Sequence, residues 1–181
     1  IQLDFFANDM PMRQHWNQAV FLKSRQSLDA KWLDQGVKAI IRHHHALRFG
    51  YREQNGNWQQ IAMQTVAPDV LWVRDAADAE QLLALCNATQ RSLNLHEGPL
   101  IRALLVNMAD QSQRLLLVVH HLVIDGVSWR ILVEDLEAAY AQAKNHETII
   151  LPEATSDYPL WTHRLQQYMH DYANEFTYWK N

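Results

Sequence analysis

Apolar side chains recur every three or four residues in several stretches of the chain, which is the spacing of the buried face of a helix. In the first stretch, Leu33, Val37 and Ile40 follow Asp29, a residue type that is favoured as a helix N-cap. Helices are therefore predicted at four places: residues 29–45, the segment after Asp78, the segment from Ser128, and a last helix from about Asp157 that is rich in Trp and Tyr.

Between these helices, apolar residues either alternate with polar ones or form short runs, and both patterns indicate strands. Asn55-Gly56 is typical of a tight hairpin turn between two strands. Residues 100–108 and 114–120 predict two adjacent antiparallel strands, of which the second is buried on both faces. With one more strand at residues 70–73, the chain is predicted to belong to the α/β (or α+β) class, with a mixed β-sheet and flanking helices.

The 181 residues, 48% of them hydrophobic, are enough for one domain with a core and too few for two ordinary ones. A formal net charge of −4 without a basic stripe argues against nucleic acid as a partner. Cys86 is the single cysteine and no apolar run approaches membrane-spanning length, so we expect a soluble, cytoplasmic protein. The five glycines are scattered, which excludes the usual nucleotide-binding loops. Because the chain begins without methionine, we expect an excised piece.

The segment most informative about chemistry lies where the strand at 114–120 ends and the next helix begins. His120 and His121 stand at that junction, and because side chains alternate along a strand, they should face opposite sides. A neutral imidazole can take up and return a proton near neutral pH, which suits general acid and base catalysis. One of the two histidines is thus a candidate for acid/base chemistry, and the other is expected to be structural.

His120, His121, Asp125 and Gly126 form the pattern His-His-x-x-x-Asp-Gly, which resembles the signature of the condensation-type domains of nonribosomal peptide synthetases. This superfamily also includes chloramphenicol acetyltransferase. Other motifs of the family are matched at two places: Ile1-Gln2 followed by Phe5-Phe6, and the run His44-His45-Ala46-Leu47-Arg48. Two strings are more similar to epimerization domains than to ordinary condensation domains: His15-Trp16-Asn17-Gln18, and the run from Asp125 to Leu132 that includes Trp129 and Arg130.

The resemblance implies that residues 1–181 form the N-terminal lobe of such a domain, with a chloramphenicol acetyltransferase-like fold and a C-terminal lobe absent from this chain. It implies an enzyme that interconverts the L and D configurations at the α-carbon of an aminoacyl or peptidyl thioester. A carrier protein domain would hold that substrate on its phosphopantetheine, and no cofactor or metal of the enzyme's own is implied. His121 would exchange the α-proton, whereas the second acid/base group, a Glu, would belong to the absent lobe. We therefore expect this chain alone to be inactive.

The resemblance also assigns supporting roles around His121. His120 would be packed or hydrogen-bonded behind the site, and Asp125 would hold the turn through an ion pair with Arg48, whose alternative is a surface role. Ser128 is predicted to be the N-cap of the following helix. The remaining supporting residues in this segment are Gly126 and Trp129.

Two other functions are compatible with the signature. In a condensation domain, the same His121 would assist an amine that attacks a thioester, and a peptide bond would result. A degenerate module would only dock carrier proteins, although the intact His121 and Asp125 argue against that. Trp129, Arg130 and the string His15-Trp16-Asn17-Gln18 favour epimerization over condensation.

Other titratable residues are less promising candidates. The run His43-His44-His45 does not predict a metal site, because consecutive side chains on one helix turn spread over about 200° of arc. Glu134 and Glu137 follow the signature on its helix but do not match the family's Glu motif, so we expect both to be solvated.

Overall fold

The central element of the fold is a four-stranded mixed β-sheet, in a computed structural model that describes residues 2–154, 158–172, 178 and 180. Its strands are β1 (Asn17–Lys23), β4 (Leu71–Ala76), β5 (Ile101–Met108) and β6 (Gln113–His120), in the spatial order β1-β6-β5-β4. β6 pairs antiparallel with both β1 and β5, whereas β4 and β5 are parallel. The predicted fold class and the predicted antiparallel pair of strands are confirmed.

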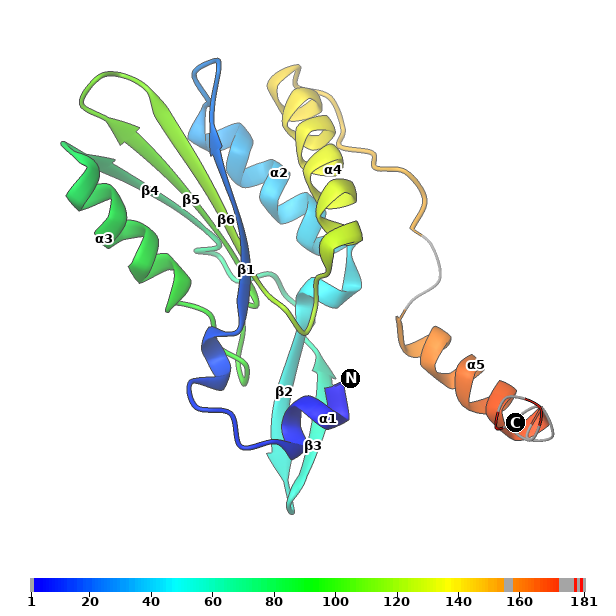
Figure 1. Cartoon of the computed structure of the whole chain (residues 1–181). Helices are drawn as coiled ribbons and strands as arrows, with labels where there is room; N and C mark the ends of the chain where they lie inside the picture. The colour runs from blue at the N-terminus through cyan, green and yellow to red at the C-terminus, as the bar shows by residue number, and fades with distance from the viewer. Residues whose placement is uncertain (1, 155–157, 173–177, 179, 181) are drawn as a thin grey trace.

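Helices cover both faces of this sheet, as Figure 1 shows. α2 (Ala30–His43) and α4 (Gly126–Lys144) lie on one face, and α3 (Ala79–Gln90) lies on the other. The side chains of Asp29 and Asp78 accept backbone N–H groups at the starts of α2 and α3, which confirms the first N-cap and supports the predicted start after Asp78.

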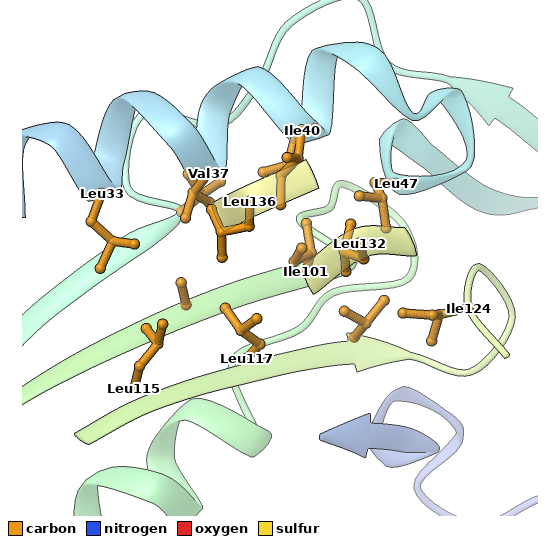
Figure 2. Close-up of a cluster of buried hydrophobic side chains, with 14 of the residues drawn as sticks. Leu33, Val37, Ile40, Leu47, Ile101, Leu115, Leu117, Ile124, Leu132 and Leu136 are labelled. Atoms are coloured by element: carbon orange, nitrogen blue, oxygen red, sulfur yellow. The ribbon is translucent and has the colours of Figure 1, made fainter. Parts of the chain in front are cut away.

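β6 is buried on both of its faces, as its continuous apolar run predicts. Leu115 and Leu117 contribute to the core beneath α2 and α4, where Figure 2 shows them facing Leu33, Val37 and Leu136. Leu116 and Val118, which alternate with them along the strand, belong to the second core, beneath α3. A strand enclosed in this way has a well-defined register, because a slip of one residue would exchange its two faces.

A second, two-stranded sheet is formed by β2 (Phe49–Gln54) and β3 (Asn57–Ala62), which are joined at the predicted turn. Asn55 (φ 53°) and Gly56 (φ 76°) both adopt the left-handed conformation that such a tight hairpin requires. The short helix α1 (Gln2–Ala7) packs against this hairpin through a cluster that joins Phe5 to Tyr51.

The last helix, α5 (Tyr158–Asp171), lies apart from the sheet and its helices (Figure 1). Its predicted first residue, Asp157, lies outside the described residues. Large apolar side chains on this helix are exposed to solvent, including Trp161 (57%) and Tyr168 (50%). Among the described helices, we find no apolar stretch of the length that a bilayer crossing requires.

Candidate active site

The end of β6 places His120 and His121 in different surroundings, as the alternation of side chains predicts. His120 is the last residue of β6 and lies opposite Asn17 of β1. His121 follows the strand and donates its backbone N–H to the Trp16 carbonyl at 2.8 Å, so the pairing with the β1 side of the sheet continues past the strand end.

His120 is fully buried, and both of its ring nitrogens are bonded to the backbone. Nε2 lies 2.9 Å from the carbonyl oxygen of Arg13 and donates to it, whereas Nδ1 accepts the N–H of Leu122 at 3.2 Å. Burial lowers the pKa of His120 below its usual 6.5, because the charged ring would lose its hydration. These contacts agree with the structural role expected for this residue.

His121 is half-buried, and its ring contacts both side chains near the start of β1 and a backbone carbonyl of the turn that follows β6. Its Nδ1 is 2.8 Å from the Ile124 carbonyl oxygen, and its Nε2 is 3.2 Å from the side-chain nitrogen of Gln18. The ring of Trp16 lies 4.6 Å away from centroid to centroid. Of the two histidines, His121 is therefore the one whose ring is bonded to a side chain and is partly open to solvent.

Gln18 connects His121 to Trp129, which stands in the first turn of α4. The indole Nε1 of Trp129 donates a hydrogen bond of 2.8 Å to Gln18 Oε1. Sequence reasoning noted the string that contains Gln18 but missed its contact with His121. One signal for this contact was available in the sequence: the string that contains Gln18 and the run that contains Trp129 both resemble epimerization domains, although they are far apart in the sequence.

Asp125, and not Ser128, is the N-cap of α4, so the predicted cap residue is wrong. Asp125 Oδ1 accepts the backbone N–H of Ser128 at 2.7 Å and its hydroxyl at 2.6 Å. The Ser128 side chain and backbone bonds, in that order, lower the pKa of Asp125 below its usual 3.8. The cap lies three residues earlier than predicted because the Asp125 carboxylate reaches the free N–H of Ser128 in the first turn of the helix.

The predicted ion pair between Asp125 and Arg48 is also absent from the described residues. Asp125 is satisfied by Ser128, whereas the buried Nε of Arg48 has no hydrogen-bond partner. Gly126 is the first residue of α4, and a Cβ at this position would meet nothing within 4 Å, so no close approach explains the glycine. Glu134 and Glu137 are exposed, as expected.

His43 and His44 do not lie on one continuous helix, because α2 ends at His43 and His44 has an extended backbone (φ −89°, ψ 100°), and their rings are 4.9 Å apart from centroid to centroid. Together with Asp135 of α4 they offer three potential metal ligands within 4.8 Å of one another. The expectation that their side chains splay apart is wrong for this pair. His44 Nε2 and Asp135 Oδ2 are 2.7 Å apart, and this bond, which ties α2 to α4, needs no ion.

The chain as a whole matches a known family of proteins. The family profile described as Condensation domain matches residues 1–181, and the chain belongs to this family. The resemblance to condensation-type domains of nonribosomal peptide synthetases is thereby confirmed.

Particular relatives agree with this assignment. The chain is 37% identical over 188 residues to tyrocidine synthase 2 of Brevibacillus parabrevis, covering 100% of this chain and 5% of that protein. Among solved structures, it resembles the epimerization domain from the third module of tyrocidine synthetase B, with 36% identity and a TM-score of 0.89 over 97% of this chain and 41% of that one. The starter condensation domain of rhizomide synthetase shares the fold, with 17% identity and a TM-score of 0.74 over 92% of this chain and 42% of that one. The chain thus spans less than half of each of these proteins.

Because burial disfavours the charged form of His120, we predict that this residue makes folding stability depend on pH. The pKa of His120 in the unfolded chain is 6.5, and its pKa in the folded chain is lower. Between these two values the unfolded chain binds a proton that the folded chain does not. The contribution of His120 to folding stability is therefore fully present above pH 6.5 and is lost as the pH falls through the folded pKa. The loss is at most about 1.4 kcal/mol per pH unit. Urea unfolding of His120→Asn should show lower stability near neutral pH and a smaller slope below it than the wild type. Equal slopes would contradict this account, and His15→Asn, at an exposed site, is the control.

For the cap of α4, we predict that Asp125→Ala costs about 0.5–2 kcal/mol of stability, whereas Asp125→Asn costs less because asparagine can also cap a helix. A double-mutant cycle with Arg48→Ala should give a coupling energy below about 0.5 kcal/mol, because the two side chains do not meet. Denaturant unfolding measures both quantities. A coupling of several kcal/mol would instead establish the ion pair.

Proposed function

We propose that this chain is the N-terminal lobe of an epimerization domain, which interconverts the L and D configurations at the α-carbon of a carrier-bound aminoacyl or peptidyl thioester. The observation that carries the proposal is the hydrogen-bonded series in which Trp129 bonds Gln18 and Gln18 bonds His121. These two residues come from the two strings that resemble epimerization domains more than condensation domains. The epimerization-like features of the sequence thus converge on the ring that would handle the proton.

A condensation domain is the second candidate, because it would use the same histidine to assist an attacking amine. The His-His-x-x-x-Asp-Gly signature is compatible with both reactions. Two observations support epimerization: the contacts of Gln18 and Trp129, and the 36% identity to a solved epimerization domain over 97% of this chain.

The proposed reaction is a proton exchange at carbon. His121 takes the α-proton as the Cα–H bond breaks, and the electron pair moves into the thioester carbonyl to give an enolate-like intermediate. A proton returned from the opposite side gives the other configuration and restores the carbonyl. Such an exchange needs a second acid or base facing His121 across the substrate. On the helix after the signature, Glu134 is exposed and bonded to Arg130, and Glu137 is exposed, so neither supplies that group.

We assign the second group to a C-terminal lobe that this chain does not contain. The match to only 41% of the solved epimerization domain supports this assignment. The exposed apolar side chains of α5 support it as well, because a surface with Trp161, Leu165 and Tyr168 is suited to contact another part of a protein. The carrier protein domain would deliver the substrate on phosphopantetheine, so the enzyme would need no cofactor of its own.

To test the function, we predict that His121→Ala in the complete two-lobed protein slows α-proton exchange by a factor on the order of 10²–10⁴, the usual contribution of a general acid or base. The measurement is mass spectrometry of deuterium uptake from D₂O into the carrier-bound aminoacyl group. His146→Asn, just beyond the C-terminal end of α4, should exchange at the wild-type rate. If His121→Ala also kept that rate, the catalytic assignment would be wrong.

A further inference from the structure

Three hydrogen bonds link Trp129, Gln18, His121 and Ile124 in series, and the groups at the two ends of the series determine which atom donates in each bond. At one end, the Trp129 indole N–H can only donate, and it lies 2.8 Å from Gln18 Oε1. At the other end, the Ile124 carbonyl can only accept, and it lies 2.8 Å from His121 Nδ1. Between them, Gln18 Nε2 and His121 Nε2 are 3.2 Å apart.

The two end groups, the Trp129 N–H and the Ile124 carbonyl, determine where each proton of this hydrogen-bond series lies. Trp129 obliges Gln18 to turn its carbonyl oxygen toward the indole, so the amide N–H groups face the imidazole. Ile124 obliges Nδ1 of His121 to carry a proton. In the neutral ring Nε2 is then left with its lone pair, which accepts the N–H of Gln18. The arrangement selects one tautomer of His121 and one ring orientation.

We propose that Gln18 is a positioning residue for proton exchange, and that Trp129 orients it. Gln18 holds His121 in the tautomer whose lone pair is on Nε2, and Nε2 is the atom that takes the α-proton once the Gln18 side chain has moved aside. This inference rests on the proposed epimerization and adds to it the reacting atom and the residues that prepare it.

Comparison with His120 shows why a side chain suits this position. In His120 the roles are reversed, with Nε2 donating to the Arg13 carbonyl and Nδ1 accepting from the Leu122 N–H, and both partners are backbone groups. A backbone partner on Nε2 of His121 would occupy the lone pair permanently. The Gln18 side chain can move aside when a substrate arrives, and its bond to Nε2 is the longest of the three in the chain.

The most informative variant is Gln18→Glu, which keeps the shape of the side chain but replaces the amide donor with a negatively charged acceptor. A carboxylate still accepts from Trp129, but it cannot donate to Nε2. Two acceptors would then face each other unless a proton lies between them, so the variant should hold His121 in the doubly protonated form. A doubly protonated ring has no lone pair with which to take the α-proton.

The test is ¹⁵N NMR of the full chain labelled in histidine, near neutral pH, with the His121 signals assigned by their loss in His121→Ala. We expect the wild type to show a protonated Nδ1 and an unprotonated Nε2, and Gln18→Glu to show both nitrogens protonated. Trp129→Phe keeps an aromatic ring but removes the N–H that holds the Gln18 amide in one orientation. The Gln18 amide can then rotate, and the His121 signals should show a mixture of tautomers. Gln60→Glu adds the same charge at an exposed position of β3 and should leave the wild-type pattern unchanged.

A wild-type His121 protonated on Nε2, or signals that neither Gln18→Glu nor Trp129→Phe alters, would overturn the inference. This readout does not depend on activity, so it separates the two proposals. Expected NMR spectra together with a complete protein that exchanges no α-proton would support the selection of the His121 tautomer by Gln18 and refute the epimerization. In an active protein, Gln18→Glu should lower kcat at least about tenfold with little change in KM, because it removes the base rather than a substrate contact.

Discussion

The antiparallel pairing of β1 with β6 is the constraint on which the candidate site depends. Its register sets Asn17 opposite His120 and Gln18 opposite Val119, and it brings Gln18 to His121 across 103 positions of sequence. A shift of one residue would turn every side chain of β1 to the other face of the sheet. Gln18 would then lose its contact with His121, and the carbonyl groups of Arg13 and Trp16 would lose their bonds to His120 and His121.

β6 can hold this register because apolar side chains pack on both of its faces, under α2 and α4 on one side and under α3 on the other. Immediately after the strand, the chain turns through Ile124, whose carbonyl fixes Nδ1 of His121, and reaches Asp125, which caps α4. The same cap places Trp129 in the first turn of that helix. Strand pairing, the turn and the helix cap therefore together position the imidazole of His121 and its hydrogen-bond partners.

Local patterns in the sequence were enough to predict most of this framework, because helix caps, the Asn55-Gly56 turn and the run of β6 depend on near neighbours. β1 was not predicted because it is an edge strand whose side chains are mostly exposed, so its alternation is weak. The cap was misplaced because Asp125 and Ser128 are both good capping residues and only the backbone decides between them. The contact of Gln18 with His121 depends on long-range pairing, which periodicity in one sequence does not reveal.

The site that Gln18, His121 and Trp129 form is proposed to exchange a proton at carbon rather than to join two amino acids. The most direct measurement gives the complete wild-type protein an L-aminoacyl thioester on one carrier domain and a free amine acceptor on a second. Chiral chromatography of the released products should find D-residue from the first carrier and no new amide on the second. A peptide on the second carrier, with its L configuration retained, would contradict the account and show a condensation enzyme instead.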